Sequence, residues 1–288
     1  MALNPTRIAR VVRAAVPAGA RIPSSQARAV VNDIRRQAGA AVDIVGEITQ
    51  LGQVPSVHNI PVFILDRANW AKLASESVAN MLTTARISNT ELAIAFAVMA
   101  PRLLGQYDPY TDAGRLIFLA PNIERFQRAF QLNQSDVCLW AAVHEMTHAY
   151  QFAVAPWLAP MIAHYTQQII ESAHDEQIIE QAMTAMSVLE GHAEYVMNRV
   201  PHRQLPSRDR IIRAMSARRS ARTPMLSRVM RLLGFENKTQ QYISGERFVA
   251  GVIQKAGMDT FNMLWNSADH MPTAAELADP ALWIERMS

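Results

Sequence analysis

The pentapeptide H-E-M-T-H, which begins at His144, lies inside an apolar stretch from Ser135 to Phe152. This stretch contains neither glycine nor proline, and its apolar residues recur at helical spacing. Because residues four apart share a helix face, the imidazoles of His144 and His148 point to one place. Two histidines on a core-facing stripe need hydrogen-bond partners or a metal ion, since unpaired buried polar groups are costly. The spacing therefore predicts a metal-holding helix, with Ser135 or Asp136 as its N-cap.

Glu145 lies one step round the predicted helix, near enough to take a proton from a metal-bound water. A purely structural zinc site has no use for such a glutamate and more often has four Cys or His ligands. We therefore predict Zn²⁺ as the cofactor, His144 and His148 as metal ligands, and Glu145 as general base and then general acid. The expected activity is that of a zinc-dependent metallohydrolase that acts on a peptide or another amide.

Residues 186–197 offer the third protein ligand that such a site needs. Glu190 and Glu194 are four apart within an apolar stripe, which a solvated helix face does not explain. In a metal site, one carboxylate binds the ion and the other accepts a hydrogen bond from a ligating histidine. Gly191 costs about 1 kcal/mol relative to alanine in a helix interior, which indicates that no side chain fits there. A surface glutamate pair or an interhelix salt bridge is the alternative.

The sequence E-G-H-A-E at residues 190–194 resembles the E-x-x-A-D/E ligand helix of gluzincin metallopeptidases. This resemblance implies that Glu190 binds zinc and that Glu194 orients a zinc-bound histidine. More widely, the chain resembles a group of zincin-like hydrolases named for an association with biosynthesis of the deazaflavin coenzyme, for which the resemblance implies no substrate. The segments that carry it are ILDRANW (64–70), QYDP (106–109), GRLIFLAPNIERF (114–126), LWAAVHEMTHAYQFAVAPWL (139–158), LEGHAEYVMNRV (189–200), QQYISGERFV (240–249) and MPTAAELADPALWIERM (271–287).

Glu190 follows His148 by 42 positions (190 − 148 = 42), and the residues between them form a connector. Pro156 and Pro160 end the motif helix, because proline cannot continue the backbone ladder. A second apolar-periodic run, residues 161–173, predicts a connecting helix, after which the ligand helix begins near Gln177. The predicted site is thus built from a helix, a connecting helix and a returning helix.

Several other residues compete for roles in the site. His164 and His174 in the connector are weaker alternatives as metal ligands, since neither has a histidine four residues away. His192 is a stronger alternative as a ligand, but it lies on a different helix face from Glu190, so we expect it to line the cleft or contact substrate. The tetrahedral intermediate needs an electrophilic partner besides the metal. The candidates by residue type are Tyr242, Tyr195, Tyr150 and His192, of which the resemblance favours Tyr242 as a catalytic residue.

Composition restricts the class of protein. Of the 288 residues, 50% are hydrophobic and 18% are charged, which is typical of a globular chain with a sizeable core. No run of apolar residues is long enough to span a membrane. The N-terminal residues include several arginines but no apolar segment after them, which argues against a secretion signal. The chain has a single cysteine, Cys138, and so no internal disulfide, which suits a reducing compartment. We predict a cytoplasmic location, with Cys138 as a small core residue.

The remaining pattern is mostly helical, at residues 27–52, 66–84 and much of 207–265. Two short runs, 60–66 and 115–120, are rich in β-branched and aromatic residues and predict strands. The fold class is therefore mainly α with a small β-sheet (α+β), with zincin-like active-site helices. We expect one domain, residues 1–288, with an N-terminal helical part of about 1–60 packed on it.

Arginine is concentrated between Arg203 and Arg231, a segment with nine arginines and one acid, Asp209. This gives the segment about +8, and the rest of the chain about −5, since the total is +3. Such a segment attracts anions, so an anionic peptide or small amide substrate is one expectation. The alternative function is a non-catalytic metal-binding or scaffold protein that recognises an anionic partner there. Without interleaved aromatic residues, no nucleic acid is expected as a partner, and the oligomeric state is left open.

Overall fold

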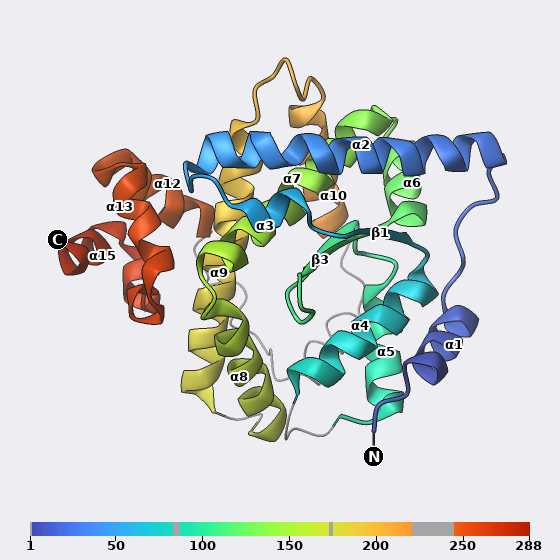
Figure 1. Ribbon diagram of the computed structural model, residues 1–288, viewed down its shortest axis with the longest axis horizontal. Helices are drawn as coiled ribbons and strands as arrows, with labels where there is room; N and C mark the ends of the chain where they lie inside the picture. Colours follow the sequence, from blue (N-terminus) through green and yellow to red (C-terminus); the bar gives the residue numbers. More distant parts are fainter. Residues whose placement is uncertain (1, 83–86, 173–174, 221–244) are drawn as a thin grey trace.

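The computed structural model describes all residues except 1, 83–86, 173–174 and 221–244 (Figure 1). It is mainly helical with one small sheet, so the predicted fold class is confirmed. The longer helices among the described residues are α1 (Pro5–Ala15), α2 (Ser24–Thr49), α4 (Arg67–Met81), α5 (Asn89–Met99), α6 (Ala120–Ala129), α7 (Gln134–Val154), α8 (Leu158–Glu171), α9 (Glu176–Arg199), α10 (Arg208–Ser220) and α12 (Gly245–Ala256). Shorter helical segments are α3 (Pro55–His58), α13 (Met258–Asn262), η2 (Met263–Asn266), η3 (Ala268–His270), α14 (Ala274–Ala278) and α15 (Pro280–Met287).

The sheet has three strands, β1 (Val62–Leu65), β2 (Gly105–Asp108) and β3 (Arg115–Leu119), in the order β1-β3-β2. Strand β1 runs parallel to the central β3, and β2 runs antiparallel to it. The two strands predicted from β-branched runs are β1 and β3, which confirms both. Strand β2 was not predicted from the sequence, and both β2 and β3 contact the motif helix.

Helix α7, which carries the H-E-M-T-H motif, runs through the main hydrophobic core. It packs against α2 on one side and α9 on another, and it also contacts strands β2 and β3. Most of its side chains are buried, as expected for a helix that is apolar on nearly every face. Its N-cap is Asn133, whose side chain accepts from the Asp136 backbone N–H, so the predicted cap at Ser135 or Asp136 is wrong. The Asp136 carboxylate instead accepts from the Ser207 backbone N–H at 2.8 Å.

The N-terminal helices pack in two different places. Helix α2 lies along the outside of α7 and is the long helix that crosses the top of Figure 1. Helix α1 lies at the lower right of that view, where it packs on α4 and α5. Together with the sheet residues Ile117 and Leu119, these three helices build a second, smaller hydrophobic cluster. The core thus has a large part around α7 and a smaller part under α1.

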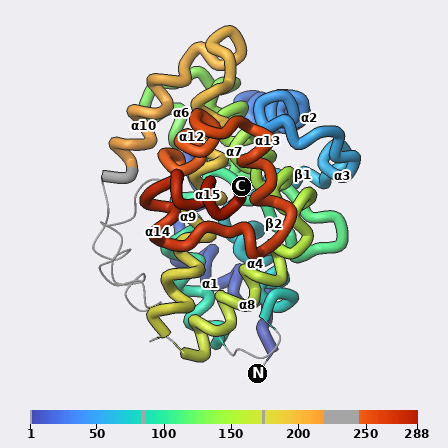
Figure 2. Tube along the Cα trace, turned by 90° about the vertical axis from the view of Figure 1, so that its left-hand side faces the viewer, coloured from blue at the N-terminus to red at the C-terminus, as the bar shows by residue number. Residues whose placement is uncertain are grey.

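The C-terminal helices α12 to α15 form a layer on one side of the molecule, beside α9 (Figures 1 and 2). Helix α12 crosses α9 at a contact between two glycines, Gly191 and Gly245. A Cβ atom added to Gly191 would lie 2.1 Å from the Gly245 carbonyl carbon, closer than atoms can approach. The sequence prediction that no side chain fits at Gly191 is therefore confirmed. Across the described parts of the chain, no helix has the length and apolarity that a membrane span requires.

Candidate metal centre

The two histidines of the motif face the same point in space, as their spacing predicts. Their Nε2 atoms lie 3.2 Å apart, and the rings stand nearly perpendicular, at 88°, with centroids 4.7 Å apart. Both side chains are partly exposed, His144 more so than His148. Helix α7 therefore holds two imidazole nitrogens close together at the edge of the core, where a ligand can reach them.

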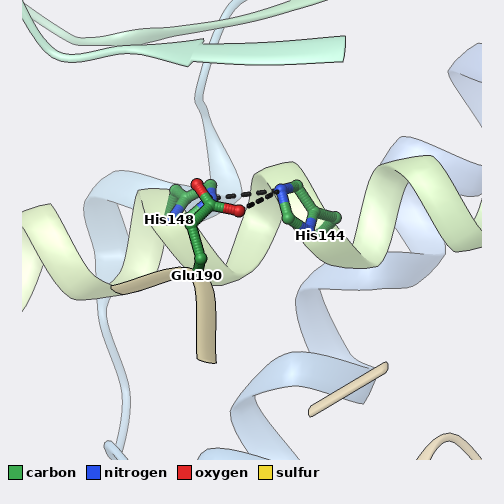
Figure 3. Close-up of side chains that lie close together, drawn as sticks. All are labelled: His144, His148 and Glu190. Carbon is green, nitrogen blue, oxygen red and sulfur yellow. Dashed lines mark hydrogen bonds and ion pairs between the residues drawn. The ribbon is translucent and has the colours of Figure 1, made fainter. Parts of the chain in front are cut away.

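Glu190 comes to the histidines from α9, a separate helix that packs against α7 (Figure 3). Its Oε2 atom lies 3.5 Å from Nε2 of His144, and its Oε1 atom lies 3.5 Å from Nε2 of His148. The glutamate side chain is 53% exposed, so it is open to a cavity rather than packed away. The three residues named as metal ligands from the sequence thus meet in the fold, although two helices supply them.

The geometry of this group fits a metal ion. Each of the three residues offers one ligand atom, and these atoms lie within 4.8 Å of one another. A tetrahedral ion bonded at about 2.0–2.2 Å places neighbouring ligand atoms roughly 3.3–3.6 Å apart. The two histidine Nε2 atoms, 3.2 Å apart, are close to that spacing, and each of the two Glu190 oxygens lies 3.5 Å from one of them. Two imidazoles and one carboxylate are also the ligand set of a catalytic site, which keeps a further position for water or substrate.

Gln151, one turn after His148 on α7, holds the second nitrogen of that histidine. Its Oε1 atom lies 2.8 Å from Nδ1 of His148. Its Nε2 atom donates to the Leu189 carbonyl at 3.0 Å and lies 3.1 Å from Nδ1 of His192. Because the carbonyl can only accept, the amide must face its NH₂ group toward α9 and its oxygen toward His148. Nδ1 of His148 then carries the proton, and Nε2 is directed at the metal position.

His192 is fully buried behind the motif helix, at 0% exposure, and lines neither of the cavities beside the metal centre described below. Its ring lies against Phe261 and Trp265, with centroids 5.1 and 5.2 Å away. Nε2 has no hydrogen-bond partner among the described residues, and burial, together with the charge of His148, lowers the pKa of His192 to about 3. The prediction that His192 lines the cleft or contacts substrate is therefore wrong. It is a neutral residue that supports Gln151.

Glu194 lines a cavity next to the centre, together with His144 and Glu190. Within the described chain, no hydrogen bond joins its carboxylate to either histidine of the motif. The contact that the sequence analysis assigned to Glu194 is made by Gln151, at least for His148. The signal that could have identified Gln151 is its place one turn after His148, as a polar side chain inside an apolar run.

Glu145 is 6% exposed and is held against strand β2. Its carboxylate accepts a hydrogen bond from the Tyr107 backbone N–H. Gly105 makes this approach possible, since a Cβ atom there would lie 2.7 Å from Cγ of Glu145. Burial and the charge of Glu190 raise the pKa of Glu145, against the charge of His148 and the Tyr107 hydrogen bond, to about 7. A carboxylate with this pKa can take up and release a proton near neutral pH.

The charges of the three clustered side chains are strongly coupled. Burial lowers the pKa of His148, but its hydrogen bond and charge interaction with Glu190 outweigh this effect and raise it to about 9. Burial and the charge of His148 lower the pKa of His144 to about 4, despite Glu190. For Glu190, burial acts to raise the pKa, and the two histidines overcome it and lower the pKa to about 2. Without a metal, the group therefore holds one carboxylate and one protonated imidazole at neutral pH.

Two cavities meet at this group. The larger, about 560 Å³, is bounded by α4, α5, β2, α7, α8 and α9. The smaller, about 330 Å³, is bounded by residues 102–105, α7, α9 and α10. The residues that line both are Leu103, Gly105, His144, Glu145 and Glu190. The metal centre and the candidate base thus lie where the two cavities join.

The remaining candidates from the sequence lie elsewhere. Tyr242 and His174 lie outside the described residues. Tyr150 is buried and donates its hydroxyl to the Val42 carbonyl at 3.2 Å, and Tyr195 is buried beneath the Arg199 guanidinium. His164 is exposed on α8 beside Tyr165. None of these described residues lines a cavity at the metal centre.

The described part of the arginine segment is tied to the fold. Arg208 donates to the carbonyls of Asn198 and Val200 at the end of α9, at 2.9 and 3.1 Å. Arg210 donates to the Gln131 carbonyl, and Arg218 to the Arg102 carbonyl. Residues 221–231 of the segment lie outside the described chain. Arg208, Arg210 and Arg218 therefore attach α10 to neighbouring segments through backbone carbonyls, in addition to any role in ligand binding.

The comparisons with known proteins agree with this geometry. A crystal structure described as "a putative hydrolase with a novel fold", from Chloroflexus aurantiacus, is similar with a TM-score of 0.77 and 26% identity, over 98% of this chain and 97% of that chain. No curated protein matches the sequence. The family model of zincin-like metallopeptidases matches residues 83–184 and 164–284, which together are more than half of the chain and include every residue of the metal centre. The chain therefore belongs to the zincin-like metallopeptidase family, whose members are expected to bind a metal ion.

Proposed function

We propose that this chain is a zinc-dependent hydrolase that cleaves a peptide or another amide bond. The observation that carries the proposal is the place of Glu145, a buried carboxylate between a metal-binding triad and two cavities. Metal binding alone does not require this glutamate. A hydrolase requires it, because a base must stand next to the attacking water.

His144, His148 and Glu190 are the proposed ligands, and zinc is the ion that best suits two imidazoles and one carboxylate in this spacing. When bound, zinc acidifies water and polarises the carbonyl of a substrate. Gln151 fixes the proton of His148 on Nδ1, so Nε2 keeps its lone pair for the metal.

Glu145 takes the proton of the attacking water and then donates it to the amine that leaves. In the metal-free protein, burial raises the pKa of this carboxyl, which favours its uptake of a proton. The Tyr107 N–H holds the carboxylate in position, and strand β2 shields it from bulk water. The proposed oxyanion partner, Tyr242, lies outside the described residues, and its role stays a prediction.

The backbone groups of strand β2 that do not pair with β3 are a second observation in favour of an amide substrate. The Leu119 N–H donates to the Leu104 carbonyl at 3.0 Å, so the alternation of an antiparallel ladder turns the backbone groups of Gly105 and Tyr107 away from β3. These groups face the cleft side, where Glu145 already takes the Tyr107 N–H. An extended substrate can pair with the rest of this edge.

The alternative, a non-catalytic binding protein, leaves the burial of Glu145 unexplained. Its proposed surface, the arginine segment, uses several of its described guanidinium groups to hold backbone carbonyls. The cytoplasmic location, the single-domain organisation and the association with deazaflavin biosynthesis stay predictions from the sequence.

Metal content tests the proposal directly. We expect mass spectrometry of untagged protein to find about one zinc per chain in the wild type and in Glu145→Gln, and much less in Glu190→Ala. Glu285→Ala, which removes an exposed glutamate on α15, is the matched control and should keep the metal. No metal in any variant after incubation with zinc would overturn the hydrolase proposal. Zinc that is retained in Glu190→Ala would overturn the ligand assignment.

A further inference from the structure

Gln106 lies on strand β2 and lines the larger of the two cavities at the metal centre. Its Oε1 atom accepts a hydrogen bond from Nε1 of Trp70, a residue of α4 that lines the same cavity, at 2.7 Å. Because an indole N–H can only donate, the amide must turn its oxygen toward Trp70 and its NH₂ group away from it. Among the described residues, none accepts a hydrogen bond from this NH₂ group. The glutamine therefore offers an oriented hydrogen-bond donor to a ligand in the cavity.

The side chain of Gln106 and the candidate base lie on opposite faces of strand β2. A Cβ atom on Gly105 would meet Glu145 of α7, so that face of the strand is turned toward the motif helix. Side chains alternate along a strand, and Gln106 accordingly contacts α4 on the other face. The larger cavity reaches both faces, since Trp70 and Glu145 both line it, and it follows the edge of β2 that does not pair with β3. A single ligand in this cavity can therefore reach both Gln106 and the metal centre.

The surroundings of Gln106 favour an uncharged ligand group. The Trp70 ring lies against Phe96, with centroids 5.0 Å apart, and both line the cavity. The described lining includes no lysine or arginine. Its carboxylates are those at the metal centre and that of Asp108, which is already paired with Arg115 at 2.8 Å. Away from the metal, an anionic group would meet carboxylates without a cation among these lining residues, and such burial of a charge is costly.

We infer that Gln106 determines substrate specificity: the group that enters the larger cavity is uncharged and mainly apolar, and it carries an oxygen that accepts a hydrogen bond from the Gln106 amide. This inference rests on the proposed function, since it assumes that the amide to be cleaved lies at the metal centre. A substrate that pairs with the edge of β2 places alternate side chains on the two faces of the sheet. One side chain then lies beside Trp70 and Phe96, in a cavity of about 560 Å³ that has room for a bulky group.

Three probes of nearly the same shape test the inference. Each is N-acetyl-alanyl-X-alaninamide, in which X is 4-acetylphenylalanine, 4-isopropylphenylalanine or 4-carboxyphenylalanine. The first carries a neutral acceptor, the second carries none, and the third carries a negative charge. Amide bonds flank X on both sides, so X can enter the cavity from either side of the cleaved bond. Each probe is measured by calorimetric Kd with zinc-loaded Glu145→Gln, which needs no turnover, and by kcat/KM with the zinc-loaded wild type.

We expect the acetyl probe to bind about fivefold or more tightly than the isopropyl probe, as for one neutral hydrogen bond. The carboxyl probe should bind more weakly than either. Gln106→Met removes the amide and should abolish the preference for the acetyl probe. Trp70→Phe, which removes the N–H that orients the amide, should reduce this preference while Gln106 stays in place. Gln204→Met, at an exposed position that lines neither cavity, should leave it unchanged, and thermal unfolding checks that each variant is folded.

The failures are distinguishable. Equal binding of the acetyl and isopropyl probes, or a preference that survives in Gln106→Met, would overturn the role of Gln106. Tightest binding of the carboxyl probe would overturn the uncharged class and favour the anionic substrate expected from the arginine segment. Zinc-loaded protein that binds none of the probes would overturn the substrate class while leaving the metal site intact. Protein that takes up no zinc would overturn the proposed function itself.

Discussion

Gln151 and His148 lie one helical turn apart on α7, with Oε1 of the glutamine 2.8 Å from Nδ1 of the histidine. The orientation of this amide is set from its other end, where the Leu189 carbonyl can only accept a hydrogen bond. One buried glutamine thus determines which nitrogen of His148 carries the proton. It also ties α7 to α9, the two helices that supply the metal ligands.

Replacement of Gln151 should weaken the metal site. We expect Gln151→Met to lower zinc affinity by about 10–100-fold, as is typical for loss of a residue that orients a metal-bound histidine. Competition with a zinc chelator at fixed pH measures this. Gln204→Met, at an exposed position, is the control. Thermal unfolding of the metal-free proteins separates this effect from a loss of fold, and unchanged affinity in a folded Gln151→Met would contradict the assignment.

Zinc binding should release a proton and become tighter as pH rises. In the metal-free protein, His148 has a pKa of about 9, so it is protonated at neutral pH, and a ligating imidazole must be neutral. Affinity should therefore rise with pH up to about 9. Calorimetry at pH 7, in buffers that differ in ionisation enthalpy, should show release of about one proton per zinc from His148. Heats that do not depend on the buffer would show that His148 is already neutral.

Because α9 and α12 cross closely at Gly191, a side chain at this position should lower the free energy of unfolding. Gly191→Ala places a methyl group 2.1 Å from the Gly245 carbonyl carbon, and we expect a loss of at least about 1–3 kcal/mol in the free energy of unfolding. Gly39→Ala is the matched control, since Gly39 lies within α2 with nothing within 4 Å of the added atom. That change should stabilise the protein by about 0.5–1 kcal/mol. Urea denaturation of both variants measures the difference, and similar stabilities would contradict the close crossing.

Cys138 should be unreactive in the folded protein. Its side chain is 1% exposed, and burial, with a smaller contribution from Asp33, raises the pKa of its thiol to about 12. Because the thiolate is the nucleophile, a chromogenic thiol reagent at pH 8 should label the native protein slowly and the denatured protein at once. Fast labelling of native protein would show that this part of α7 opens readily.

The local half of the site was predictable from the sequence. The spacing of His144, Glu145 and His148 on an apolar helix already places the two histidines at one point, because helix geometry depends on neighbours along the chain. The glutamate stripe on the later helix identified Glu190 as the best third candidate. Its meeting with the histidines depends on how α7 packs against α9, which the structure describes and periodicity alone does not.

The features that were not predicted correctly from the sequence depend on contacts between distant segments. Strand β2 is only four residues long and begins with glycine, so its composition carries no strand signal. It forms because β3 offers it a partner. Glu194 was chosen for its spacing from Glu190, but Gln151 makes the contact with His148 from the motif helix itself. The sequence places His192 near the site, but α9 directs its side chain away from the cavities and against the rings of Phe261 and Trp265.

Gly105 offers a test of how Glu145 is positioned. A Cβ atom at this position would lie 2.7 Å from Cγ and 2.9 Å from Oε1 of Glu145, so Gly105→Ala must move the carboxylate away from strand β2. The metal ligands are not displaced by this methyl group, and zinc content should stay near that of the wild type. We expect kcat for an amide substrate to fall at least about tenfold, because a displaced base transfers protons poorly. Zinc analysis and steady-state kinetics on the same preparation separate the two effects, with Gly39→Ala as the control. Full activity in Gly105→Ala would show that the contact between β2 and Glu145 is unimportant for catalysis.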